Sequence, residues 1–308
     1  MSFSKLPLFF LWSSLSTVVL SRASVDKQIK DLITSDSPLL QYPTQFTQDI
    51  VPKQIHSHND YWRDVPLYTA LSYGVGSVEA DVWLSGSDLL IGHDPESLTA
   101  DRTFDSLYLQ PLLKILSAQN PDTVYTRAAP PRINGIFDTS SGTSLNLLVD
   151  VKTDGASTLP AILQALKPLR DAGYLTTYYS NGTLVPSAIT VIGTGNTPLD
   201  LVKDLDPRDY FFDGPLANLT GYFEPTLSPI ASTDYEVAVG WNGIGTIPDD
   251  KLAKLKQLVN DAHALGIQAR FWDTPGWPVS ARNNVWKVLL ENGADWLNAD
   301  DVKAASEF

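Results

Sequence analysis

The strongest constraint on the fold is an alternation of strand-like and helix-like segments from residue 51 to the end of the chain. Short apolar runs between turn residues predict strands, and apolar residues at helical spacing predict helices. The main strands are expected at residues 53–58, 77–84, 145–151, 188–193, 210–213, 235–241, 267–272 and 295–298, with a short extra strand at 89–92. Helices are expected at residues 25–33, 66–74, 107–118, 159–172, 198–205, 251–265 and 285–291.

This alternation predicts an α/β protein with a parallel sheet, because each helix carries the chain back to the start of the next strand. About eight such units over about 250 residues are typical of a (β/α)8 TIM barrel. A doubly wound open sheet would also alternate, but no glycine-rich phosphate loop follows the first strand. We therefore expect a single TIM-barrel domain at residues 51–308, preceded by an N-terminal approach segment at 24–50.

The charge balance limits the partners. The formal net charge is −13, which argues against non-specific binding to nucleic acid or to anionic membranes, since both need basic patches. The chain has no cysteine, so disulfides, thiolate nucleophiles and cysteine-ligated zinc are excluded. Any metal ion must be held by oxygen or imidazole ligands.

The N-terminus has the features of a secretory signal peptide at residues 1–23. Lys5 precedes an apolar run, Leu6–Leu20, and small residues precede a cleavage point after Ala23. An uncleaved anchor would need a longer uninterrupted run, and a mitochondrial transit peptide would be richer in arginine. We expect a secreted, extracellular protein with no transmembrane segment after cleavage, and glycosylation acceptor sequences at Asn181 and Asn218 fit that placement.

Charged and polar residues gather where the predicted strands end. In a TIM barrel these ends form the active-site face. The residues are His56, His58, Glu79, Asp81, Asp150, Lys152, Trp272, Asn298 and Asp300, and His93 follows the short strand at 89–92. Residues two apart in a strand share a face, so His56 pairs with His58 and Glu79 with Asp81. The strand ends therefore indicate an active site at one end of the sheet.

Three carboxylates with one lysine predict a cation site. Lys152 and the histidines could form a buried salt-bridge network with Glu79, Asp81 and Asp150, because buried charges must be paired. One lysine leaves negative charge unmatched, and a divalent cation would neutralise it. Oxygen ligands alone favour Mg²⁺ or Ca²⁺ over zinc.

Histidines beside carboxylates can share acid and base work, because imidazole titrates near neutral pH. Three of the four histidines lie in this group, whereas His263 is expected on the surface of a helix. Trp272 is expected either in the core or at the site. Between the two neighbouring histidines we favour His58 for contact with substrate, with His56 lower and nearer the cation.

The ordered motifs resemble the phospholipase-C-like phosphodiesterase superfamily, which includes glycerophosphodiester phosphodiesterases and spider-venom sphingomyelinase D enzymes. The most similar branch is the fungal altered-inheritance-of-mitochondria family. The resemblance runs from about residue 50 to 303. Its motifs are His-Ser-His-Asn-Asp-Tyr-Trp-Arg at 56–63, Glu-Ala-Asp-Val-Trp at 79–83, Asp-Val-Lys at 150–152, Arg-Phe-Trp at 270–272 and Gly-Ala-Asp-Trp-Leu-Asn-Ala-Asp at 293–300.

The resemblance implies a TIM barrel that cleaves phosphodiesters, with Glu79, Asp81 and Asp150 as ligands of Mg²⁺ or Ca²⁺. It implies Lys152 as a phosphate contact and His93 as one catalytic histidine. The second catalytic histidine is His56 or His58, because the His-Arg pair usual in glycerophosphodiesterases is replaced here by His56-Ser57 and His58-Asn59. Asn59 and Trp272 join Lys152 as candidate substrate-binding residues.

The expected function is metal-dependent cleavage of a small-molecule or lipid phosphodiester, of the glycerophosphodiester or phospholipid type. One histidine would accept a proton from the attacking hydroxyl and another would protonate the leaving oxygen. A secreted glycoside hydrolase needs only a carboxylate pair and leaves the histidines unused. A non-catalytic ligand-binding barrel is the second alternative.

Overall fold

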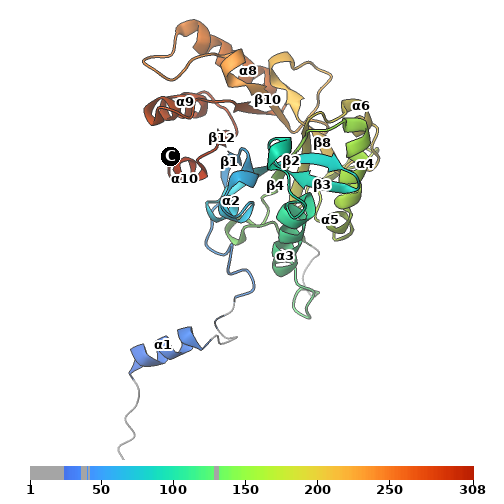
Figure 1. The fold of residues 1–308 in the computed structure, drawn as a ribbon, viewed down its shortest axis with the longest axis vertical. Coiled ribbons are helices and arrows are strands. Elements are labelled where there is room, and N and C mark those ends of the chain that lie inside the picture. Colours follow the sequence, from blue (N-terminus) through green and yellow to red (C-terminus); the bar gives the residue numbers. More distant parts are fainter. Residues whose placement is uncertain (1–23, 36–39, 41, 128–131) are drawn as a thin grey trace, which may run out of the picture. The chain divides into compact units, whose positions relative to one another are not determined.

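The computed structural model describes residues 24–35, 40, 42–127 and 132–308 (Figure 1). The chain divides into two compact units, Met1–Tyr42 and Pro43–Phe308. In the first unit, the amphipathic helix α1 spans Val25–Thr34, and the hydroxyl of Ser24 caps it by accepting from the Lys27 N–H at 3.2 Å. The helix expected at 25–33 is therefore confirmed.

The second unit contains two parallel sheets. The larger sheet has the order β12 (Leu297–Ala299), β1 (Lys53–Ser57), β2 (Val75–Ser85), β4 (Leu145–Val151), β7 (Ile189–Gly195) and β8 (Tyr210–Phe212), and β3 (Asp88–Ile91) pairs antiparallel with β2. The smaller sheet has the order β11 (Gln268–Trp272), β10 (Ile230–Asp234) and β9 (Gly214–Pro215). A separate hairpin joins β5 (Thr177–Tyr178) to β6 (Leu184–Val185).

Helices follow most of the parallel strands, as the sequence predicts. They are α2 (Tyr68–Ser72), α3 (Gln110–Gln119), α4 (Gly155–Ala165), α5 (Lys167–Asp171), α6 (Leu199–Lys203), α7 (Tyr235–Ala238), α8 (Asp249–Ala264), α9 (Val279–Glu291) and α10 (Val302–Glu307). Figure 1 shows α4, α5 and α6 grouped beside the larger sheet, and α8 beside β10. The predicted α/β fold with a mainly parallel sheet is confirmed.

The two sheets adjoin at two places. β8 continues into β9 through a single residue, Asp213, and a parallel bridge between Arg270 and Trp296 connects β11 to the segment before β12. β8 and β9 do not pair, and one bridge joins β11 to the segment before β12, so the structure shows two parallel sheets and does not confirm the closed TIM barrel. The strands nevertheless present their carboxyl ends to a common region.

Alternation along the strands sorts apolar from polar side chains. In β2, Val78, Ala80 and Val82 are fully buried in the main apolar core. The residues between them, Glu79 and Asp81, therefore lie on the opposite face of the strand. This alternation places the charged groups of β2 on the face opposite the main apolar core, where they line a cavity.

One predicted strand is wrong. Residues 235–241 were expected to be a strand, but Tyr235–Ala238 form α7, and the strand lies just before them at Ile230–Asp234. The Asp234 carboxylate accepts from the Val237 N–H at 2.9 Å and so starts the helix. Tyr235 and Val239 are both buried, four positions apart, which is a helical spacing.

Candidate active site

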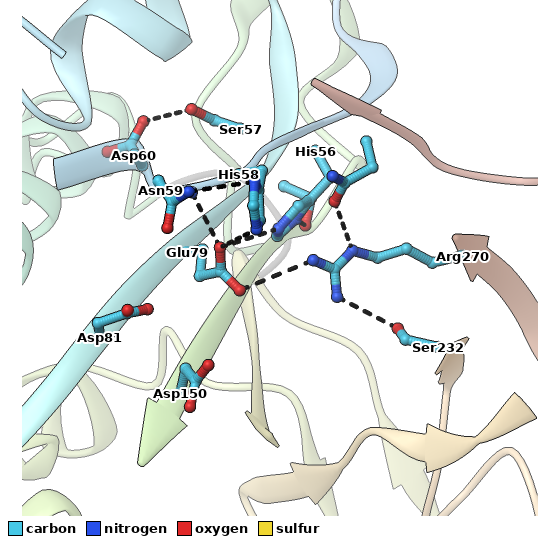
Figure 2. A network of polar contacts seen from close by, with 12 residues as sticks. His56, Ser57, His58, Asn59, Asp60, Glu79, Asp81, Asp150, Ser232 and Arg270 are labelled. Carbon is cyan, nitrogen blue, oxygen red and sulfur yellow. Dashed lines mark hydrogen bonds and ion pairs between the residues drawn. The ribbon is translucent and has the colours of Figure 1, made fainter. Parts of the chain in front are cut away.

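Three carboxylates converge at the carboxyl ends of β2 and β4. Asp81 and Asp150 are directly opposite in the parallel register, and Glu79 lies two residues before Asp81 on the same face. One ligand oxygen from each lies within 4.8 Å of the others, an arrangement that could hold a metal ion. Figure 2 shows the three side chains directed toward one region. The predicted convergence is confirmed.

A cavity of about 360 Å³ opens above these carboxylates, and we call it the strand-end cavity. Its lining is His58, Asn59, Glu79, Asp81, His93, Asp150, Lys152, Thr194, Gly195, Arg270 and Trp272. Eight of these eleven residues were predicted from the sequence. Thr194, Gly195 and Arg270 were not predicted, and His56, which was, is not part of the lining.

Lys152 bridges two of the carboxylates. Its Nζ lies 2.9 Å from Asp81 Oδ2 and 2.8 Å from Asp150 Oδ2. Burial acts to lower the pKa of Lys152, but the charges of Asp150 and Asp81 outweigh it and raise that pKa. Lys152 is therefore a fixed positive charge at the cavity wall.

Asp81 has a strongly raised pKa. Burial and the charges of Glu79 and Asp150 raise its pKa to about 7, although Lys152 opposes the shift. Its Oδ1 is buried and has no hydrogen-bond partner among the described residues. Burial also raises the pKa of Asp150. Asp81 and Asp150 together thus carry more negative charge than the surrounding side chains neutralise.

Glu79 is held ionised by its neighbours. The Asn59 N–H donates to its Oε2 at 2.9 Å, and the Nε2 atoms of His56 and His58 lie 3.9 and 3.8 Å from the same oxygen. Arg270 Nη2 lies 3.7 Å from Oε1. Burial favours the neutral form, but His56 and Arg270 outweigh it and hold the pKa of Glu79 well below its usual range.

The turn after β1 positions the Asn59 N–H. Asn59 adopts a left-handed conformation with φ of 49°, and a short 3-10 helix, Asp60–Trp62, follows it. The buried Asp60 carboxylate fixes the turn by accepting from the Ser57 hydroxyl at 2.7 Å and from the Leu67 N–H at 2.6 Å. Figure 2 shows Ser57 and Asp60 on the side away from the carboxylate cluster.

The two histidines of β1 occupy different environments. His56 is fully buried, and its Nδ1 lies 2.7 Å from the Ser77 hydroxyl. Burial, followed by the charge of Arg270, lowers the pKa of His56 to about 3, so its ring is neutral near pH 7. His58, two residues further, lines the strand-end cavity.

His58 is supported by Asp300, which follows β12. His58 Nδ1 lies 2.9 Å from Asp300 Oδ1, which leaves Nε2 on the Glu79 side. Burial opposes protonation, but the hydrogen bond to Asp300 and the charge of Glu79 outweigh it and raise the pKa of His58. This arrangement fixes the ring orientation and favours its charged form.

His93 lies beyond β3 with its side chain 48% exposed. Its Nδ1 is 3.1 Å from the hydroxyl of Tyr61, and that hydroxyl also donates to Asp81 Oδ2 at 2.7 Å. The ring of Trp62 packs against it with centroids 5.2 Å apart. Tyr61 was not among the predicted residues. It connects His93 to the carboxylate cluster.

Arg270 is a second cation that the sequence analysis did not select as a site residue. It is 3% exposed, lines the strand-end cavity and lies on the Glu79 side of the cluster, as Figure 2 shows. The sequence did contain a signal for Arg270. Residues two apart in a strand share a face, so Arg270 lies on the same face of β11 as Trp272, which was predicted as a site residue. Trp272 itself is 38% exposed at the cavity, outside the core.

The remaining predicted residues have supporting positions. Asn298 is buried and accepts from Arg270 Nε at 3.0 Å. Asp300 contacts His58, as described above. His263 pairs with Asp295 on the surface, 2.8 Å from it, and takes no part in the cavity.

Comparison with known proteins identifies relatives over most of the chain. The family model of the AIM6-like phosphodiesterase domain matches residues 44–213. An Arthroderma benhamiae protein named altered inheritance of mitochondria protein 6 homolog is 44% identical, covering 93% of this chain and 94% of that one. Altered inheritance of mitochondria protein 6 of Eremothecium gossypii is 36% identical, over 86% of this chain and 72% of its own.

A solved structure also aligns. The crystal structure of a glycerophosphodiester phosphodiesterase from Parabacteroides distasonis matches with a TM-score of 0.44 and 12% identity, covering 84% of this chain and 98% of that chain.

The relatives correct the expected location. The secreted, extracellular placement is wrong, because the matched proteins are named for the inheritance of mitochondria, a process inside the cell. An apolar N-terminal run indicates a targeting segment by its hydrophobicity, but hydrophobicity alone does not specify the compartment. Residues 1–23, on which the expectation depended, lie outside the described residues. Within the described part, no helix is both long and apolar enough to cross a membrane.

The match to the family model covers more than half of the chain, and the relatives extend it to nearly the full length. The chain belongs to the AIM6-like phosphodiesterase family.

Proposed function

We propose that this protein cleaves phosphodiesters with the help of a divalent cation held by Glu79, Asp81 and Asp150. The observation that carries the proposal is the convergence of these three carboxylates beside Lys152 and two cavity-lining histidines. The family to which the chain belongs supports the same reaction class.

The residues present fit Mg²⁺ or Ca²⁺. The donor set consists of carboxylate oxygens, which these hard cations prefer. The buried Asp81 Oδ1 lacks a hydrogen-bond partner among the described residues, and a buried carboxylate oxygen without a partner is costly. A bound divalent cation would stabilise the negative charge that develops on the phosphoryl group.

The histidines divide the proton transfers. His58, whose pKa is raised, donates a proton to the leaving oxygen, and Asp300 keeps its ring in place. His93 accepts the proton of the attacking hydroxyl, with Tyr61 holding its Nδ1. His56 is neutral and buried, and it supports Glu79 from below.

The substrate is a small-molecule or lipid phosphodiester of the glycerophosphodiester or phospholipid type. A cavity of about 360 Å³ suits a phosphoryl group with part of one substituent. Lys152 supplies a point charge for the phosphoryl oxygens, and Asn59 and Trp272 contact the substituents at the cavity wall.

Turnover on a panel of phosphodiesters tests the proposal. The purified protein is assayed on glycerophosphodiesters, lysophospholipids and sphingomyelin, with added Mg²⁺ or Ca²⁺ and with EDTA. Cleavage that EDTA abolishes and either cation restores is the expected result. EDTA-insensitive hydrolysis of aryl glycosides would favour the glycosidase alternative, and ligand binding without any turnover would favour a binding barrel.

A further inference from the structure

Arg270 is a buried arginine with unused hydrogen-bonding capacity. Its Nε donates to Asn298 Oδ1 at 3.0 Å and its Nη1 donates to the Ser232 hydroxyl at 3.2 Å. A guanidinium has five N–H donors. Within the described residues, its Nη2 makes no hydrogen bond, and its shortest carboxylate contact is the 3.7 Å ion pair with Glu79.

The carboxylates near Arg270 do not use these donors fully. Asp213 lies 3.7 Å from Nη1, as Glu79 does from Nη2, and both distances exceed those of charge-assisted hydrogen bonds. Arg170, on α5, is an arginine that pairs fully with one carboxylate. Its Nε and Nη2 both donate to the Asp209 carboxylate, and the Nη2–Oδ1 distance is 3.0 Å. If Arg270 had only a structural role, we would expect it to make the same two-point pair with a carboxylate.

The guanidinium is also fixed in orientation. Asn298 and Ser232 hold Nε and Nη1 from β12 and β10, so Nη2 remains at the Glu79 side, as Figure 2 shows. Arg270 lines the strand-end cavity despite being 3% exposed. An immobilised cation with free donors at a cavity wall is preorganised for an oxyanion.

We propose that Arg270 binds a non-bridging oxygen of the substrate phosphodiester, from the side of the carboxylate cluster opposite Lys152. This inference rests on the proposed function. A phosphodiester has two non-bridging oxygens, and the chain offers two cationic side chains. Lys152 is paired with Asp81 and Asp150, and Arg270 lies beside Glu79. Arg270, which belongs to the Arg-Phe-Trp motif at 270–272, is then a substrate-contacting residue to which the resemblance assigns no role.

The test measures phosphate binding separately from turnover. Inorganic phosphate is titrated calorimetrically into the full chain in the presence of Mg²⁺, and Mg²⁺ alone is titrated in a second series. The variant Arg270→Lys keeps the positive charge and removes the several N–H donors of the guanidinium group. We expect it to lose about 10- to 100-fold in phosphate affinity, the range for a lost charge-assisted hydrogen bond, while its Mg²⁺ affinity stays as in the wild type.

Arg170→Lys is the matched control, because it makes the same change at an arginine outside the strand-end cavity. It should bind phosphate as the wild type does. If Arg270→Lys does not fold, Ser232→Ala serves instead: it removes the acceptor of Nη1, and we expect phosphate binding several-fold weaker in a variant whose cooperative thermal unfolding shows that it folds.

Two outcomes would overturn the assignment. Unchanged phosphate affinity in the folded variants would show that Arg270 does not touch the oxyanion. An equal loss of Mg²⁺ and phosphate affinity would show that Arg270 only maintains Glu79. Either result, with EDTA-sensitive cleavage intact in the wild type, leaves the proposed function standing. A wild type that neither binds phosphate nor cleaves any phosphodiester overturns both.

Discussion

Two cavities lie at opposite ends of β4 and β7, and in the larger one Arg170 and Asp209 pair with each other through two hydrogen bonds. The strand-start cavity measures about 640 Å³ and is lined by residues that precede these strands, such as Thr143 and Ala188, together with Arg170 and Asp209. The strand-end cavity measures about 360 Å³. Size therefore does not separate a candidate active site from an ordinary surface cavity in this molecule.

The difference lies in how far the polar groups are satisfied. In the strand-start cavity, Arg170 and Asp209 form a two-point ion pair. In the strand-end cavity, Asp81 Oδ1 and Arg270 Nη2 have no hydrogen-bond partner among the described residues, and the pKa values of Asp81 and Glu79 are displaced in opposite directions. Charged groups without partners and with displaced pKa values cluster at functional sites more often than elsewhere.

The largest expected effect is on turnover. His58→Ala and His93→Ala should each reduce kcat by about 10²- to 10⁴-fold, because each removes a proton-transfer group. Steady-state kinetics on the best phosphodiester of the panel measure this, with His263→Ala as the surface control. Near-normal kcat in both variants would refute the two-histidine mechanism and weaken the contrast between the cavities.

The next effect concerns the cation. Asp150→Asn keeps the shape of the side chain but removes one anionic ligand, and we expect about 100-fold weaker Mg²⁺ or Ca²⁺ binding by calorimetry. Asp209→Asn makes the same exchange in the strand-start cavity and should leave cation binding unchanged. Equal losses in both variants would mean that the cation responds to overall charge and not to this cluster.

At the strand-start cavity the expected effect is on stability alone. Arg170→Gln should lower the free energy of unfolding by about 1–2 kcal/mol, because it leaves the buried Asp209 carboxylate without its partner. Urea denaturation measures the loss. The kcat of the folded variant should match the wild type, and a large fall in kcat would show that the two cavities are coupled.

The smallest effect is expected at Tyr61. Tyr61→Phe removes the hydroxyl that links Asp81 to His93, and kcat should fall by about 3- to 10-fold, the equivalent of one net hydrogen bond. A change in thermal midpoint with unaltered kinetics would assign Tyr61 a packing role only.

Local patterns were sufficient to predict much of this molecule. The period of two identified Glu79 and Asp81 as one pair, and the strand assignment brought Asp150 beside them. The sixth strand was misplaced because Ile230–Asp234 is short and polar at its end, whereas Tyr235–Trp241 is more apolar and buried through helical packing. At residues 235–241 tertiary packing therefore determined the structure more strongly than the intrinsic strand preference of the sequence.

The missed residues depend on contacts between distant segments. Tyr61 follows a left-handed turn at Asn59, so no strand period leads from His58 to its hydroxyl. Arg270 lies between two apolar residues of β11, and its partners among the described residues, Glu79, Asp213, Ser232 and Asn298, come from other segments. From sequence alone, a single arginine in a strand is expected to face solvent. Its buried position becomes apparent only when the partners from other segments are known.

The pairing of β1 with β12 has a consequence for synthesis of the chain. Ile55 is in register with Leu297, and the His58 N–H donates to the Ala299 carbonyl at 3.2 Å. β1 therefore keeps one edge unpaired until residues 297–299 have been synthesised, and contacts of such long sequence separation form slowly. Chains cut short before residue 297 would retain that unpaired edge, which makes them candidates for aggregation and for early removal by proteases.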